Sequence, residues 1–180
     1  MMPIGPLMIE HRLIERVIAD IRLRLEARGG PPALDADYVD RCIDFIRTYA
    51  DRCHHGKEEE ILFKELARRP LEPELAALMQ DLIEDHRRAR ALTARVVQAN
   101  ARYRAGDAHA LTDVELALAE LINIYPAHIE QEDKHFFKPC MAVFSAEERQ
   151  AMLHEFEAFD RTLIHEKYRR LVEDLEAGRT

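Results

Sequence analysis

The stretches HHGKEEEILF at residues 54–63 and HIEQEDKHFF at residues 128–137 are two copies of one pattern. In each copy a histidine is followed four residues later by a glutamate, and five residues after that by a phenylalanine. Helical residues four apart lie on the same face, so each copy directs an imidazole and a carboxylate at one point. The pattern therefore predicts two helices that each offer a pair of metal ligands.

The composition favours one folded domain and excludes several classes of partner. The chain has 180 residues, of which 47% are hydrophobic, and we expect a single domain over residues 1–180. A net charge of -8 disfavours binding to nucleic acid or to an anionic membrane. No signal peptide and no apolar run of membrane-spanning length are recognisable. Three cysteines without a CxxC spacing favour the reducing cytoplasm.

Helical periodicity between Gly- and Pro-rich breaks predicts an all-α chain. Four long helices are expected at about 6–28, 35–69, 73–105 and 112–137, with caps at Asp35 and Thr112 and with Pro73 in a first turn. Short connections between them predict an up-down four-helix bundle over about 6–138. An additional C-terminal helix over about 146–177 should open with a capping box at Ser145 and pack across the bundle.

Each of the four bundle helices has one histidine on its apolar seam. These residues are His11, His54, His86 and His128. A rise of about 1.5 Å per residue, counted from one end of an antiparallel bundle, places all four in one layer. Glu58 and Glu132 share their faces with two of them, and buried carboxylates are costly without a cation.

Six such ligands inside one bundle favour two carboxylate-bridged ions over one tetrahedral zinc, and iron, manganese and zinc all suit the ligand types. Two further HxxxE spacings, at His11 with Glu15 and at His55 with Glu59, are weaker indications. His55 and Glu59 share a stripe with Arg41, Thr48 and Arg52, so we interpret them as surface residues or as outer supports of the ligands.

The order H, HxxxE, H, HxxxE resembles that of hemerythrin-like (HHE cation-binding) domain proteins. The resemblance implies a non-haem di-iron centre in which the four seam histidines bind iron terminally and Glu58 and Glu132 bridge. Oxygen-carrying members have a fifth histidine four residues from the helix-three ligand, where this chain has Leu82 and Arg90. Candidates for an extra ligand are Tyr125, His135, Glu15, His165 and Tyr168.

Two local features should shape the centre. Apolar residues of the seams are expected to line a pocket that keeps solvent from a bound ligand; they are Leu7, Ile14, Ile61, Leu82 and Phe136. Pro126 removes a helical hydrogen bond and should kink or bulge its helix just before His128.

Three functions follow as hypotheses. The first is binding of oxygen or another small oxidant for storage, sensing or detoxification, with a small diatomic molecule or peroxide as the partner. The second is an enzyme that turns over peroxide or nitric oxide at the same centre. The third is a histidine phosphotransfer module, which requires an exposed histidine in the stretch His54-His55-Gly56-Lys57. The oligomeric state is left open by the sequence.

Overall fold

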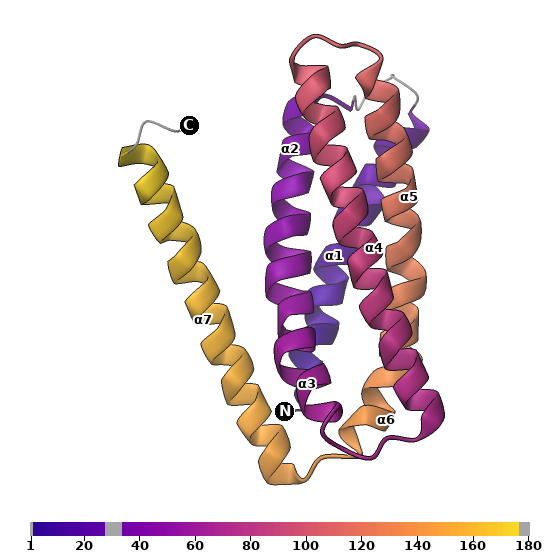
Figure 1. Cartoon of the computed structure of the whole chain (residues 1–180), viewed down its shortest axis with the longest axis vertical. Coiled ribbons are helices and arrows are strands. Elements are labelled where there is room, and N and C mark those ends of the chain that lie inside the picture. The colour runs from indigo at the N-terminus through magenta and orange to yellow at the C-terminus, as the bar shows by residue number, and fades with distance from the viewer. Residues whose placement is uncertain (1, 28–33, 177–180) are drawn as a thin grey trace.

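Four antiparallel helical segments form a bundle, and a fifth long helix leaves it at one end (Figure 1). The structure is a computed structural model that describes residues 2–27 and 34–176, with side chains as far as residue 163. The bundle consists of α1 (Ile4–Glu26), the run α2 (Ala36–Phe45), η1 (Ile46–His55), η2 (Glu58–Phe63) and α3 (Lys64–Leu66), α4 (Pro73–Arg104), and the run α5 (Ala110–Gln131), η3 (Glu132–Phe136) and α6 (Phe137–Met141). The fifth helix is α7 (Ala146–Glu176). The predicted all-α bundle is confirmed, and the described residues include no strand.

Helix starts follow the expected capping chemistry at three of four positions. Asp35 accepts a hydrogen bond from the Tyr38 backbone N–H across 2.7 Å, and Pro73 opens α4. Ser145 Oγ accepts from the Glu148 N–H across 3.2 Å, and Glu148 accepts in return from the Ser145 N–H across 2.7 Å. The reciprocal pair is the capping box that the sequence predicted.

The predicted cap at Thr112 is wrong, because α5 already begins at Ala110. The carboxylate of Asp107 accepts a hydrogen bond from the His109 backbone N–H across 3.1 Å. This contact closes a turn ahead of Thr112, so the chain enters the helix earlier than the hydrophobic pattern indicates.

The two stretches that contain predicted HxxxE metal ligands include wide helical turns. The segments η1, η2 and η3 are π-helical, with the ladder of hydrogen bonds one residue longer than in an α-helix. Each residue of such a turn advances the helix by a smaller angle. The faces of residues 46–63 therefore differ from those counted with the α-helical period.

Pro126 lies inside α5 without interrupting it, and the wide turn begins only at Glu132, after His128. The wide turn therefore lies after His128 and not before it, where the sequence predicted a bulge. A proline has no N–H to donate to the carbonyl four residues before it, here that of Ile122. The guanidinium of Arg22 on α1 donates to this carbonyl across 3.5 Å, which compensates for the missing bond.

The core is divided into two apolar clusters along the bundle axis. One is built around Ile14, Ala50, Ala89 and Tyr125 and extends toward the loop after α4. The other is built around Leu7, Ile61, Leu82 and Phe136 and lies at the end that holds α3 and α6. On every bundle helix the two clusters are separated by the predicted ligands. The centre is therefore a polar layer with apolar packing on both sides.

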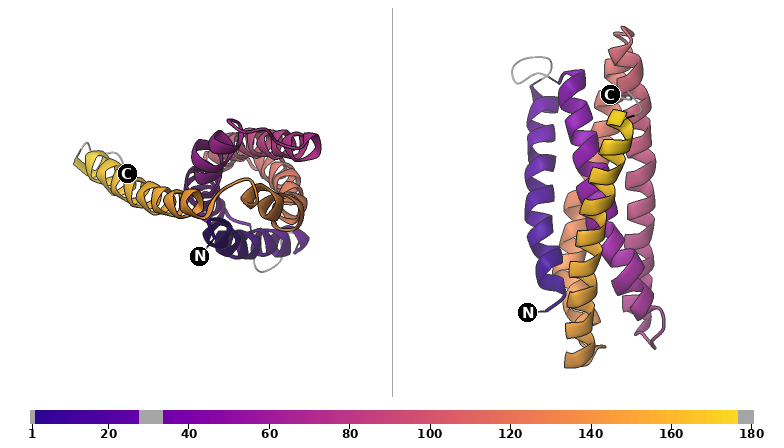
Figure 2. Two further views of the ribbon diagram at one scale, coloured as in Figure 1. Left: turned by 90° about the horizontal axis from the view of Figure 1, so that it is seen from below. Right: turned by 90° about the vertical axis from the view of Figure 1, so that its left-hand side faces the viewer.

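The first half of α7 packs against η1 and η2, where Met152, Leu153 and Phe156 are buried. Gly56 permits close approach there, because an added Cβ would lie 2.7 Å from Cζ of Phe159. Further along, α7 diverges from the bundle (Figures 1 and 2). The side chains of α7 beyond residue 163, on which the rest of the expected packing across the bundle depends, lie outside those described. None of the helices in the described part of the chain is long and apolar enough to cross a membrane.

Candidate metal centre

The six predicted ligands meet in one buried layer. His11 comes from α1, His54 and Glu58 from η1 and η2, His86 from α4, His128 from α5 and Glu132 from η3. Their exposed fractions lie between 0% and 3%. Four histidines and two glutamates without solvent contact require compensation of their polar atoms.

The histidines form two pairs. Nε2 of His11 lies 2.9 Å from Nε2 of His54, and Nε2 of His86 lies 3.1 Å from Nε2 of His128. Two nitrogens bound at right angles to one ion, each at about 2.1 Å, are about 3.0 Å apart. Both pairs thus have the spacing of two adjacent ligands on one cation.

The two carboxylates connect these pairs. Oε2 of Glu58 lies 3.6 Å from Nε2 of His54 and 3.5 Å from Nε2 of His86. Glu132 places Oε2 at 3.0 Å from Nε2 of His11 and Oε1 at 3.3 Å from Nε2 of His128. Each glutamate therefore reaches one member of each pair, as a bridging ligand must.

Carboxylate oxygens without donors provide the test of whether a cation fits here. Both oxygens of Glu58 and both oxygens of Glu132 are buried and have no aligned hydrogen-bond donor among the described residues. Burying such atoms unpaired costs several kcal/mol per charge on an order-of-magnitude scale. Two groups of four residues, each with ligand atoms within 4.8 Å of one another, share these glutamates: His11 and His54 belong to one, His86 and His128 to the other. The residues present fit divalent cations.

A ring of acidic residues fixes the histidines from outside. Nδ1–H donates from His11 to Asp133 across 2.8 Å, from His54 to Glu10 across 2.9 Å, and from His86 to Glu59 across 2.7 Å. Nδ1 of His128 lies 3.7 Å from Asp85. A proton on Nδ1 leaves the Nε2 lone pair directed inward, which is the tautomer that binds a metal.

These acidic partners follow a simple rule in the sequence. Each is the immediate neighbour of a predicted ligand, in the dipeptides 10–11, 58–59, 85–86 and 132–133. Yet each serves the histidine of another helical segment. The outer-support interpretation of Glu59 fits this arrangement, whereas Glu10, Asp85 and Asp133 were missed, and only their adjacency to ligands could have indicated them.

Lys57 is a fully buried cation beside the centre. Its Nζ pairs with Glu10, the partner of His54, and lies 3.0 Å from Asp160 on α7. Cys53 donates its Sγ–H to the same Asp160 across 3.2 Å. The C-terminal helix is thus connected to a metal-ligand candidate through two ion pairs.

Burial and neighbouring charges shift the pKa values of the inner groups. Burial lowers the pKa of His11, but the hydrogen bond to Asp133 and the negative charge of Glu132, 3.0 Å from Nε2, outweigh it and raise the pKa to about 9. Burial lowers the pKa of His54 to about 4, despite its bond to Glu10. Burial, reinforced by the charge of Glu132, raises the pKa of Glu58 well above its ordinary value. Without a metal, His11 therefore holds a proton at neutral pH, and Glu58 keeps its proton to a higher pH than an ordinary glutamate.

His55 was interpreted as a surface residue or as an outer support of the ligands, and the structure contradicts the surface interpretation. Its side chain is only 2% exposed, and its ring stacks on that of His86 with centroids 3.8 Å apart. The wide turns of η1 are the physical reason, since they change the face on which position 55 falls. His55, His86 and His128 form a further buried group whose ligand atoms lie within 4.8 Å of one another.

The candidates for an extra ligand lie in different surroundings. Tyr125 is buried beside His55, with a hydroxyl that has no hydrogen-bond partner among the described residues. His135 is exposed, and Glu15 pairs with Arg12 at the surface, so neither reaches the centre. His165 and Tyr168 lie beyond the described side chains.

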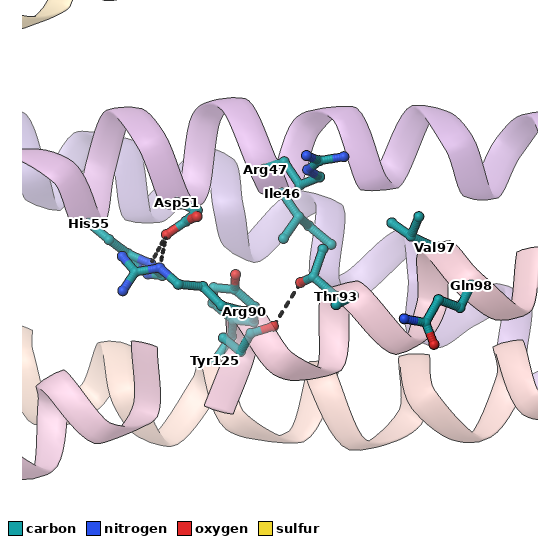
Figure 3. A pocket seen from close by; sticks show the side chains of 11 residues that line it. Ile46, Arg47, Asp51, His55, Arg90, Thr93, Val97, Gln98 and Tyr125 are labelled. Carbon is teal, nitrogen blue, oxygen red and sulfur yellow. Dashed lines mark hydrogen bonds and ion pairs between the residues drawn. The ribbon is translucent and has the colours of Figure 1, made fainter. Parts of the chain in front are cut away.

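A cavity of about 360 Å³ opens beside the centre. Figure 3 shows His55 and Asp51 at one end, Tyr125 and Arg90 next to them, and Gln98 toward the other end. Arg90 donates to Asp51 across 2.6 Å at the side of the cavity. The cavity has polar and apolar walls, and the side chain of His55 lies between it and the cluster of predicted ligands.

Aromatic rings cover the opposite side of the layer. Phe137 stacks on His11 at 5.7 Å, Phe63 stacks on His86 at 6.0 Å, and Phe63 meets Phe136 edge to face at 5.5 Å. The five residues predicted to line an apolar pocket are all buried, although Ile14 belongs to the cluster on the other side. Rings and aliphatic groups leave few polar competitors for a small ligand.

Comparison with known proteins agrees with this geometry. Residues 2–140 match the family model of the hemerythrin HHE cation-binding domain. The chain is also 27% identical, over 154 residues, to proteins from Mycobacterium tuberculosis and Mycobacterium bovis that are described as uncharacterized. The aligned region covers 84% of this chain and 58% of those relatives, so the chain spans little more than half of their length. No solved structure was found to match it.

Proposed function

This chain belongs to the hemerythrin HHE cation-binding family, and we propose that its six inner residues hold two iron ions that bind oxygen or another small oxidant. One iron would be held by His11 and His54 and the other by His86 and His128, with Glu58 and Glu132 bridging. Storage, sensing and detoxification of the oxidant all remain within this proposal. The partner is a small diatomic molecule or peroxide.

One observation carries the proposal. Two pairs of inward nitrogens, at 2.9 and 3.1 Å, are joined by two carboxylates that each approach both pairs. A single tetrahedral ion needs four ligands and would leave the others buried without compensation. Imidazole and carboxylate without thiolate suit iron, and binding of an oxidant requires a redox-active metal, which excludes zinc.

Residues around the centre orient its histidines before a metal or an oxidant binds. Asp133, Glu10 and Glu59 fix three imidazoles by accepting from Nδ1, so little reorganisation is required when metal binds. The rings of Phe63, Phe136 and Phe137 exclude water from one side. When bound, the iron pair would supply electrons and open coordination positions for a small oxidant.

Turnover of peroxide or nitric oxide is the second candidate, and the cavity beside His55 and Arg90 favours it, because it provides space near the centre. The phosphotransfer hypothesis loses its support. Both His54 and His55 are at most 2% exposed, whereas phosphotransfer requires a histidine that a partner domain can reach.

The experiment is a visible spectrum of the iron-loaded chain after anaerobic reduction, repeated after air is admitted. A new charge-transfer band that reverses under vacuum supports oxygen binding. A band that disappears once and leaves the protein oxidised supports removal or sensing of an oxidant. Catalytic decay of added peroxide or nitric oxide would support the enzyme instead.

His54→Ala is the matched variant for this test. It should abolish every oxygen-dependent spectral change, and an unchanged spectrum would contradict the assignment of the centre.

The three cysteines are free, with Cys42 and Cys140 buried, which supports a proposed cytoplasmic location.

A further inference from the structure

Of the histidines with described side chains, His55 is buried in the layer but is not used by the six-residue centre. Its Nδ1 has no hydrogen-bond partner among the described residues. The nearest acidic group is the carboxylate of Asp51, 3.5 Å away, which accepts a hydrogen bond from Arg90 instead. A buried polar atom without a partner is costly, by about 1–3 kcal/mol in typical proteins. Such an atom in a native core requires a reason.

The neighbours of His55 provide one. Its ring centroid lies 3.8 Å from that of His86 and 5.8 Å from that of His128. Each of the three histidines offers a ligand atom within 4.8 Å of the other two. Among the residues whose side chains the structure describes, no third histidine is grouped with His11 and His54, whose group is completed by the two glutamates.

We propose that His55 supplies a third histidine nitrogen to the metal position held by His86 and His128. The inference rests on the proposed function. It makes the two metal positions unequal, with three histidines at one and two at the other. The position held by His11 and His54 then retains more open coordination for a small oxidant.

Ring orientation defines what must change on metal binding. The rings of His55 and His86 are now nearly parallel, with an interplanar angle of 12°. Two nitrogens cannot point at one ion from face-to-face rings, so His55 must leave this stack. The cavity of about 360 Å³ that His55 lines gives its ring room to turn (Figure 3).

Once the ring has turned, Asp51 would accept a hydrogen bond from the Nδ1 that now lacks a partner, and Nε2 would bind the metal. Asp51 lies one turn before His55 on η1, is paired with Arg90, and lies 3.5 Å from Nδ1 of His55. Of the other four histidines, three donate from Nδ1 to an acidic residue, and Nδ1 of the fourth lies 3.7 Å from Asp85. The surroundings of His55 thus repeat the pattern of the ligands rather than that of a packing residue.

The test is an anaerobic Fe²⁺ titration of the metal-free full chain against a competing chelator. His55→Phe preserves the ring that stacks on His86 but removes both nitrogens. We expect the wild type to bind two ions and the variant to bind one of them at least about tenfold more weakly, since loss of an outer partner alone costs that much. His135→Ala, which removes an exposed histidine, is the matched control and should titrate like the wild type.

A His55→Phe titration that superimposes on that of the wild type would overturn the inference and leave the proposed function intact. A wild type that takes up no iron would overturn both. If His55→Phe does not fold, as judged by the loss of its helical circular dichroism, a crystal structure of the iron-loaded wild type is the deciding test. A crystal structure with a His55 nitrogen at about 2.1 Å from one iron supports the proposal, and a His55 ring still stacked on His86 contradicts it.

Discussion

Glu10 on α1 accepts a hydrogen bond from Nδ1 of His54 on η1 across 2.9 Å. The same carboxylate pairs with Nζ of the buried Lys57. One acidic side chain thus orients a metal-ligand candidate and neutralises a cation that has no access to water. Predictions about metal affinity and about stability follow from these two contacts.

Glu10→Gln should weaken metal binding by about 10–100-fold, because outer acidic partners of metal-bound histidines contribute on that scale. The neutral amide accepts a weaker hydrogen bond, so Nε2 of His54 becomes less basic. Competition with a chelator under anaerobic conditions measures the affinity. Glu15→Gln, on the surface of the same helix, should have no effect, and equal affinities of the two variants would contradict the role of Glu10.

Lys57→Met should lower the free energy of unfolding by about 3–5 kcal/mol, since it leaves the largely buried charge of Glu10 without its counter-ion and with the hydrogen bond from His54 alone. Urea unfolding measures the change, and Lys64→Met, at an exposed position of the same helical run, is the control. Combining Lys57→Met with Glu10→Gln should recover part of the loss. A double variant as unstable as the sum of the two single variants would show that the pair does not interact.

Metal binding at pH 7 should release the proton that His11 holds in the metal-free protein, because the pKa of His11 is raised to about 9. Burial and the charge of Glu132 raise the pKa of Glu58, so any proton that Glu58 holds is released as well. A metal displaces these protons, so affinity increases with pH. The release from His11 should disappear above pH 9, where His11 is already neutral.

Calorimetry in buffers of different ionisation enthalpy measures this release. His11→Gln should release about one proton fewer at pH 7. An affinity that is independent of pH between 6 and 9 would show that the metal-free centre does not hold these protons.

Phe156→Ala should destabilise the protein by about 3–5 kcal/mol, the usual cost of deleting a buried aromatic ring. Phe156 is 2% exposed and belongs to the core cluster around Leu7 and Phe136, although it comes from α7. His154→Ala, two residues earlier and exposed, should change the unfolding free energy little. Equal stability of both variants would mean that α7 contributes no core.

The sequence was sufficient to predict the bundle and the meeting of the six candidate ligands in one layer, because the apolar seams recur at helical spacing and the seam histidines interrupt them at one height. It was insufficient to predict that His55 is buried and that α5 begins at Ala110. The α-helical period does not hold through η1, so the face of residue 55 could not be counted correctly. A side-chain contact from Asp107 rather than hydrophobicity determined where α5 begins.

The outer partners illustrate a different limit. Glu10 and Asp133 are adjacent in sequence to ligands that they do not serve, and each bonds to a histidine of another helical segment. Such pairings depend on how the helices are rotated against each other. Periodicity within one helix does not determine that rotation.

The most direct test of the two-ion centre is iron content combined with X-ray absorption of the reduced, iron-loaded chain. We predict two irons per chain with an iron–iron scattering distance of about 3.5–4 Å, the separation typical of bridged metal pairs in proteins. One iron per chain, or two without mutual scattering, would contradict the bridging roles of Glu58 and Glu132. A chain without iron would contradict the centre itself.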